Sequence, residues 1–177
     1  MHILETNRLI LRTWTDADIQ PMFEINQDPK VMEYFPNLQS LETTTDFVNK
    51  AKQHFDQHGY CLYACAKKES NNFIGFIGLS HVDFKVHFTP AVEIGWRLAY
   101  KHWGQGIATE GAKAVLDDAF QRLKIPEIVS FTAVGNARSI RVMQKIGLHH
   151  DPQDDFDHPC LDEESPLRRH VLYRLTR

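Results

Sequence analysis

Two glycines, Gly104 and Gly106, lie between a strand-like and a helix-like run of the sequence. The start of a helix leaves several main-chain N–H groups unpaired and carries the positive end of the helix dipole, so it can hold an anion without a charged side chain. Glycine allows unusual backbone angles and lets a ligand approach the main chain closely. The sequence therefore predicts a phosphate or pyrophosphate site at this turn.

A G-x-G pair alone is a weak indication, because many tight turns between a strand and a helix contain one. Two other phosphate motifs do not fit the letters. A P-loop requires G-x-x-x-x-G-K-[ST], and the dinucleotide fingerprint requires a third glycine where Thr109 stands.

The runs on either side of the turn have the periodicities of a strand and a helix. Residues 92–98 alternate between apolar side chains and Glu93, Gly95 and Arg97. In residues 107–124, apolar side chains recur at spacings of three and four and form one stripe: Ile107, Ala108, Ala112, Val115, Leu116, Ala119, Phe120 and Leu123.

The run from Val92 to Gly111 resembles motif A of the GCN5-related N-acetyltransferases (GNAT superfamily). In that motif Q/R-x-x-G-x-G/A wraps the pyrophosphate of acetyl-coenzyme A (acetyl-CoA). The letters E-I-G-W-R-L and W-G-Q-G-I-A-T-E are similar to the RimJ/RimL-like branch of ribosomal-protein N-terminal acetyltransferases. Lys101 stands where the motif usually has Gln or Arg, which matters little because backbone amides make most of the anion contacts.

Two more segments extend the resemblance over nearly the whole chain. Members of this branch often open with E-T-x-R-L-x-L-R, and residues 5–12 read E-T-N-R-L-I-L-R. Residues 135–148 are similar to the second superfamily motif, N-x-x-[SA]-x-x-x-x-x-K-x-G-F. Asn136 could be only a helix N-cap and Ser139 only a first-turn residue. Two motifs in the family's order favour the functional interpretation.

The resemblance implies that acetyl-CoA is the cofactor and that two segments hold most of it. Main-chain groups of Trp96, Arg97 and Leu98 would position the thioester, where a splay from the strand at 128–134 admits the pantetheine arm. The pyrophosphate would bind the amides of 102–108: His102, Trp103, Gly104, Gln105, Gly106, Ile107 and Ala108.

An amine can attack the thioester only when it is neutral, so a base must remove its proton. Glu93, on the strand before the glycine turn, is the candidate base and would act through water. The structural alternative is a strand carboxylate paired with Arg97 or with a neighbouring strand. A protein N-terminus needs less help than a lysine, because the pKa of its amine is about 8 rather than about 10.4.

The departing thiolate requires a proton or a hydrogen bond. Many superfamily members supply it from a tyrosine at the position of Met143, and that tyrosine is absent here. The resemblance points instead to Ser139, beside Asn136, and both residues would also contact the coenzyme. Tyr100 and Tyr173 are alternatives without an assigned place.

The acceptor is an amine, either a protein N-terminus or a small molecule such as a polyamine, amino acid or drug. In this superfamily the segment after the first strand lines the acceptor site. Tyr34, Phe35 and Phe55 are therefore candidate walls, with Glu93 beside them. Core packing is the alternative that the helical spacing of the aromatic residues favours.

We expect one α/β domain over residues 1–177, of the GNAT type, with a mixed, strongly twisted sheet and helices on both faces. The patterns predict an opening strand at 3–13, a helix from Thr15 or Asp16 to about Gln27 and a helical turn at 31–35. Further along they predict a helix at 41–57, a hairpin of 60–67 with 73–80, a strand at 128–134, a helix from Asn136 to Gly147 and a strand at 168–175.

A net charge of −3 argues against a duplex nucleic-acid binder. No membrane span or signal peptide is expected, and we expect a cytoplasmic monomer or homodimer. Cys61 and Cys65 are expected to share one face of a strand as buried thiols, and no metal site is expected. The acidic block 151–164 is interpreted as a solvated loop, or as an attractor for a cationic amine.

Two rival classes remain. A non-catalytic acyl-CoA-binding module would explain the missing tyrosine at Met143. A structural subunit or toxin component of the same fold is the other, although toxins that bind tRNA tend to be basic.

Overall fold

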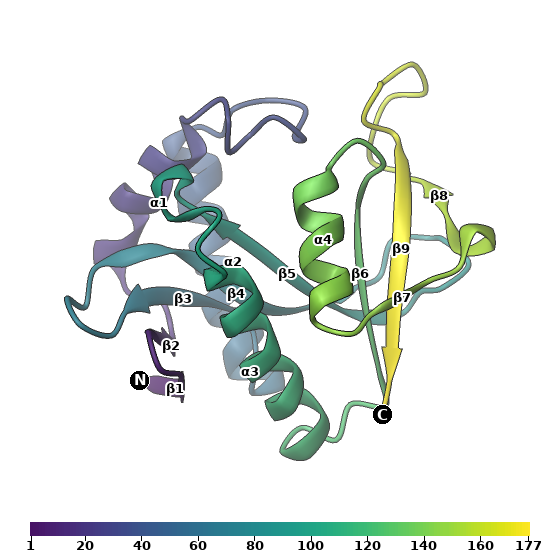
Figure 1. The fold of residues 1–177 in the computed structure, drawn as a ribbon. Coiled ribbons are helices and arrows are strands. Elements are labelled where there is room, and N and C mark those ends of the chain that lie inside the picture. Colours follow the sequence, from purple (N-terminus) through teal and green to yellow (C-terminus); the bar gives the residue numbers. More distant parts are fainter.

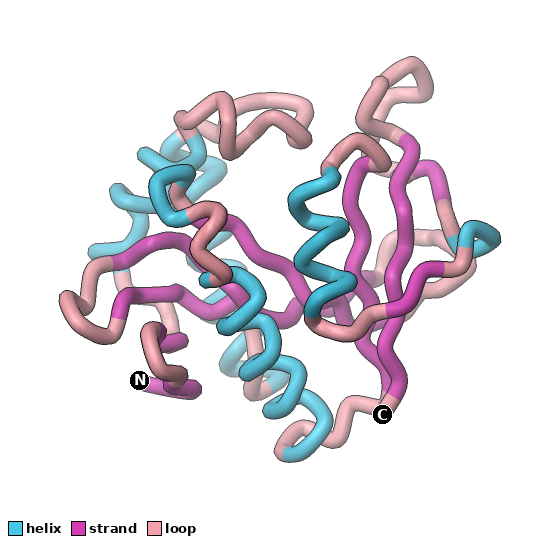
Figure 2. The backbone as a smooth tube through the Cα atoms, in the orientation of Figure 1, coloured by secondary structure: helices cyan, strands magenta, loops and turns pink.

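The computed structural model describes residues 1–177 and is built around one mixed sheet (Figures 1 and 2). Its strand order is β1-β2-β3-β4-β5-β6-β9-β7, with β8 also paired to β9. The strands are β1 His2–Glu5, β2 Leu9–Arg12, β3 Leu62–Lys67, β4 Phe73–Val82, β5 Ala91–Leu98, β6 Glu127–Ala133, β7 His149–His150, β8 Phe156–Asp157 and β9 Arg169–Thr176. Only the pair β5 and β6 is parallel.

Four α-helices cover the sheet: α1 Ile19–Asn26, α2 Leu41–His58, α3 Ile107–Gln121 and α4 Ala137–Lys145. Three short 3-10 helices join them: η1 Asp16–Asp18, η2 Tyr100–His102 and η3 Pro152–Asp154. None of these helices has both the length and the apolar character that crossing a membrane requires.

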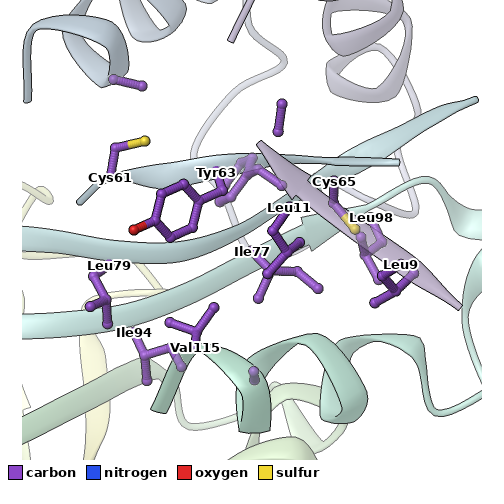
Figure 3. Close-up of a cluster of buried hydrophobic side chains, with 14 of the residues drawn as sticks. Leu9, Leu11, Cys61, Tyr63, Cys65, Ile77, Leu79, Ile94, Leu98 and Val115 are labelled. Carbon is purple, nitrogen blue, oxygen red and sulfur yellow. The ribbon is translucent and has the colours of Figure 1, made fainter. Parts of the chain in front are cut away.

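The helix α3 packs on one face of β4 and β5, and the predicted apolar stripe faces them. Figure 3 shows Ile77 of β4 and Ile94 of β5 facing Val115 of α3. The approach is close at Gly111, where an added Cβ would lie 2.5 Å from Cδ1 of Ile77. This packing forms one part of the main core, which also includes Met22 of α1 and Val48 of α2 on the other face.

The helices α1 and α2 cover the opposite face, so the prediction of helices on both faces is confirmed. The ring of Phe47 on α2 lies 5.1 Å from that of Phe76 on β4. The predicted hairpin of β3 and β4 is present, and Asn136 caps α4 by accepting a hydrogen bond from the N–H of Ser139. Cys61 and Cys65 are buried free thiols, as predicted.

Two local predictions are wrong. The opening segment is not one strand but a hairpin, in which β1 and β2 pair antiparallel across residues 6–8. Residues 31–35 form turns rather than helix. The hairpin turn depends on a distant residue, because the Thr6 hydroxyl and the Arg8 N–H both donate to Oε1 of Glu110 on α3.

The acidic block is partly solvated, but several of its carboxylates are bound to the sheet. Asp154 accepts from Arg174 at 2.6 Å, and Asp155 lies 2.8 Å from Nε2 of His150. Asp157 accepts from Arg169 at 3.3 Å. These contacts tie the first half of the block to β7 and β9, whereas residues 162–164 are exposed.

Candidate functional site

The neighbouring strands β5 and β6 separate along their length. They pair only at Glu93 and Val129, and Ser130 Oγ donates to the carbonyl of Ile94 at 2.9 Å. Beyond this point the strands diverge toward the top of Figure 1. The predicted splay is therefore present.

Main-chain groups of β5 line this gap. Alternate residues of a strand present their main-chain groups to the same edge, so Trp96 and Leu98 share the edge of Ile94. The Leu98 carbonyl accepts from the indole N–H of Trp103 at 2.8 Å. The N–H and carbonyl of Trp96 and the N–H of Leu98 thus face the gap without a strand partner.

The glycine turn connects the top of β5 to α3. Gly104 and Gly106 both have φ of +73°, and Gly106 is the N-cap of α3 without a side-chain cap. An added Cβ at Gly104 would meet no heavy atom within 4 Å. The turn therefore leaves room for an anion at the N-terminus of a 15-residue helix.

Two arginines that the sequence reasoning missed flank this turn. Arg8 donates from Nε to Glu110 at 2.5 Å and from Nη1 to the carbonyl of Gln105 at 2.9 Å. Its Nη2 would lie 3.7 Å from a Cβ added at Gly106. Arg138 of α4 lies 4.7 Å from the centre of the Trp103 ring. The pattern E-T-N-R marked Arg8 as part of a motif but gave no partner for it.

Glu93 points along β5 toward Gly95. Its Oε1 would lie 3.9 Å from a Cβ added at Gly95, and Cδ2 of Leu62 would lie 3.6 Å from the same position. Ser80 Oγ donates to Glu93 Oε2 at 3.5 Å, and burial raises the pKa of Glu93 to about 8. Glu93 forms no ion pair with Arg97, so that part of the structural alternative is wrong, whereas the contact with Ser80 on β4 agrees with the other part, a partner on a neighbouring strand.

Arg97 lies on the same face of β5 as Glu93. Its main chain is directed at β4, where it pairs with Phe76, so only its side chain is available to a ligand. Nη1 donates to Asn26 Oδ1 at 2.7 Å and to Gln39 Oε1 at 3.3 Å.

Asn136 and Ser139 lie together at the start of α4. The Asn136 amide nitrogen donates to Thr132 Oγ1 at 2.9 Å and to Ser139 Oγ at 3.1 Å. Because Ser139 Oγ accepts this bond, its own hydrogen stays free to be donated. Both amide hydrogens of Asn136 are used within the chain, so its side chain could offer a ligand only the oxygen.

The three candidate acceptor walls lie in different places. The loop between α1 and α2 reaches across to the start of α4 (Figure 2), where the Tyr34 hydroxyl donates to the Gly135 carbonyl at 2.9 Å. The Phe35 ring covers the guanidinium of Arg97 at 4.1 Å. Phe55 instead lines a separate hollow of about 360 Å³ with Trp14 and Cys61. The structure therefore groups Tyr34 and Phe35 but not Phe55.

The position of the missing tyrosine and the two alternative tyrosines, Tyr100 and Tyr173, lie in different parts of the structure. Met143 is 1% exposed and belongs to the core. Lys30 Nζ lies 4.2 Å from the centre of the Tyr100 ring, and Tyr173 stacks on His150.

Comparisons with known proteins agree with this geometry. Residues 8–149 match the model of the acetyltransferase (GNAT) domain family. The uncharacterized protein YkkB of Bacillus subtilis is 33% identical over 148 residues, which are 83% of this chain and 85% of that protein. The uncharacterized N-acetyltransferase YnaD of the same organism is 30% identical over 152 residues, covering 85% and 84%.

Solved structures share the fold. An acetyltransferase (GNAT family) from Bacillus anthracis superposes with a TM-score of 0.80 at 26% identity, covering 99% of this chain and 98% of that one. RimL, a ribosomal L7/L12 alpha-N-protein acetyltransferase solved with coenzyme A, gives a TM-score of 0.79 at 18% identity and covers 99% and 98%. At that identity the likeness to RimL concerns the fold alone.

Proposed function

The chain belongs to the GNAT acetyltransferase family, and we propose that it transfers the acetyl group of acetyl-CoA to a primary amine within a ternary complex. The observation that carries this proposal is the gap between β5 and β6, which opens beside an uncapped glycine turn at the start of α3. The acceptor is a protein N-terminus or a small amine.

The coenzyme would lie along this gap. Its pyrophosphate would bind the amides of 102–108, with Arg8 and Arg138 as flanking cations. Its pantetheine arm would use the free main-chain groups of Trp96 and Leu98. Side chains elsewhere in the turn have room to vary, because these contacts come mainly from the backbone.

The reaction forms a bond between the amine nitrogen and the acetyl carbon and breaks the carbon–sulfur bond. Glu93, acting through a water, would accept the amine proton. Ser139 would donate its free hydroxyl hydrogen to the thiolate as charge develops on sulfur. Holding both substrates in one site supplies much of the rate.

A non-catalytic acyl-CoA-binding module is the second candidate, and the core position of Met143 is the observation in its favour. The two candidates differ in turnover. An enzyme releases coenzyme A faster when an amine is present, whereas a binding module does not.

Calorimetric titration with acetyl-CoA, NAD and ATP is the test of the proposal, followed by thiol release with a panel of amines. We expect selective binding of acetyl-CoA and amine-dependent release of coenzyme A. Binding without turnover on any peptide N-terminus or small amine would favour the module, and absence of binding would refute both.

A further inference from the structure

The guanidinium of Arg97 has no acidic partner in this chain. Its Nη1 donates only to the neutral oxygens of Asn26 and Gln39. Its Nε is fully buried without a hydrogen bond, and Nη2 forms none. Buried cations in proteins are usually paired with an anion, because removing a charge from water is costly.

The unused atoms lie on one edge of the guanidinium. Nε and Nη2 together form the fork with which arginine binds a carboxylate through two parallel hydrogen bonds. The structure therefore keeps the two neutral bonds on Nη1 and leaves the carboxylate-binding edge without a hydrogen-bond partner.

The surroundings hold the guanidinium in place. Asn26 and Thr44 are both 0% exposed, and the Asn26 amide nitrogen donates to Thr44 Oγ1 and to Gln39 Oε1, each at 3.0 Å. The rings of Phe35 and Phe76 lie 4.1 and 5.5 Å from the guanidinium carbon. Burial lowers the pKa of Arg97 to about 10, so the group stays charged at neutral pH.

Arg97 shares one face of β5 with the candidate base. Glu93, Gly95 and Arg97 lie along that face, and the glycine places no side chain of its own between the two charged side chains, although Cδ2 of Leu62 from β3 would lie 3.6 Å from a Cβ added there. The Cα atoms of Glu93 and Arg97, four residues apart along the strand, are separated by roughly 13 Å. The distance between the carboxylate and the guanidinium depends on how the two side chains extend. An acceptor whose amine is beside Glu93 can therefore reach Arg97 with a second functional group.

We propose that Arg97 binds a carboxylate of the acceptor, so the preferred substrate is an amine that carries a carboxylate several bonds away. This inference rests on the proposed acetyl transfer and narrows its acceptor. Because Nε is closed off from solvent, neighbouring side chains must shift when the carboxylate enters, and the exposed ring of Phe35, which lies over the guanidinium, is our candidate for this movement. Phe35 would then cover the bound acid.

The first test is a ladder of amino acids with increasing separation of amine and carboxylate: glycine, β-alanine, 4-aminobutyrate and 6-aminohexanoate. Each is compared with its own carboxamide, and spermidine and a short peptide with a free N-terminus complete the set. We expect one or two lengths to be acetylated with a kcat/KM at least about tenfold above the matching amide, as a charge-assisted pair would give.

Variants separate acceptor recognition from a structural role. Arg97→Gln should remove the preference for acid over amide, chiefly through a higher KM for the acids. Arg122→Gln, which removes an equal charge from the far end of α3, is the matched control and should keep the preference.

A second variant places the missing charge inside the chain. Asn26→Asp would pair with Arg97 at the position that Asn26 Oδ1 now occupies, so it should abolish the preference for acid acceptors; because an aspartate cannot donate the two hydrogen bonds of the Asn26 amide nitrogen, no gain in stability is expected. A purely structural Arg97 predicts that the acceptor preference stays unchanged in Asn26→Asp.

The outcomes are distinct for the two proposals. Equal acetylation of acids and amides by the unmodified protein, or a preference for spermidine, would overturn the carboxylate site and leave acetyl transfer standing. If no amine is acetylated, the proposed function fails. In that case, NMR binding of 4-aminobutyrate and its amide to the unmodified and Arg97→Gln proteins decides the carboxylate site alone.

Discussion

At the scale of single residues, the protonation of Glu93 decides when the site can work. Because burial raises the pKa of this carboxyl group to about 8, most of it is protonated at pH 7 and cannot accept a proton. We expect kcat to rise with pH through about 8, and Glu93→Gln to lower kcat by about a hundredfold or more and to remove this rise. A pH series at saturating acetyl-CoA measures both.

The amine of the acceptor also titrates, so the series needs two acceptors with different amine pKa values. A rise caused by Glu93 stays at the same pH for both acceptors, whereas a rise caused by the amine moves with it. Survival of the rise in Glu93→Gln would exclude Glu93 as the base.

Ser139 is the second residue with a proposed chemical role. Since its main-chain N–H, not its hydroxyl, makes the cap of α4, Ser139→Ala should leave the helix intact. We expect kcat to fall about tenfold to a hundredfold, the range for a hydrogen bond to a charged group, with unchanged affinity for acetyl-CoA. Stopped-flow thiol release and calorimetry measure the two quantities, and an unchanged kcat would remove Ser139 from the mechanism.

The sequence was sufficient to predict which residues belong to the candidate site, but not which side chains they contact. Glu93 and Arg97 were visible from the alternation of one strand, because period two assigns faces without tertiary information. The neutral partners of Arg97 could not be predicted, since Asn26 and Gln39 lie in segments that only the folded chain brings together.

At the scale of elements, the role of the glycine turn before α3 can be tested by comparison with a second glycine that has the same backbone angles. Gly106 has φ and ψ of 73° and 8°, and Gly59, at the end of α2, has 74° and 9°. Replacing either glycine with tryptophan imposes the same backbone strain, on the order of 1 to 2 kcal/mol. We expect only Gly106→Trp to abolish binding of acetyl-CoA, as measured by calorimetry.

Gly59→Trp is the control for that strain and should lose a similar amount of stability while binding normally. Normal binding by a folded Gly106→Trp protein would show that the coenzyme does not occupy the turn.

Elements with their own local signals were predictable, and those fixed by distant contacts were not. The apolar stripe of α3 and the cap of α4 are each determined by residues close together in the sequence, and both predictions are confirmed. The turn at residues 6–8 depends on Glu110, about a hundred positions away. The local strand pattern carried no sign of this contact and therefore predicted one continuous strand.

At the scale of the whole molecule, three buried or partly buried histidines predict loss of stability in acid. His54 Nε2 accepts from the His81 N–H at 3.1 Å, so Nδ1 carries the proton and donates to the Tyr60 carbonyl. Burial lowers the pKa values of His54, His158 and His170. Their unfolded forms have a pKa of about 6.5 and bind protons first as the pH falls.

The stabilising contribution of these neutral rings is therefore complete above about pH 6.5 and is lost below it. We expect the thermal midpoint to fall between pH 7.5 and 5.0, and to fall less in His54→Gln than in a variant of the exposed His149. A midpoint that stays constant over this range, or an equal fall in both variants, would contradict the assignment.

The separation of β5 from β6 also has a consequence for how quickly the protein is degraded in a cell. Between β5 and β6 the hydrogen bonding is limited to one ladder pair and one serine, although the two parts of the sheet share a hydrophobic core, so a ligand in the gap would supply contacts that a neighbouring strand would otherwise make. A ligand at about a hundred times its dissociation constant stabilises the folded state by about 2.7 kcal/mol. The abundance of this protein should then follow the supply of its coenzyme, because molecules without it open more often and reach proteases first.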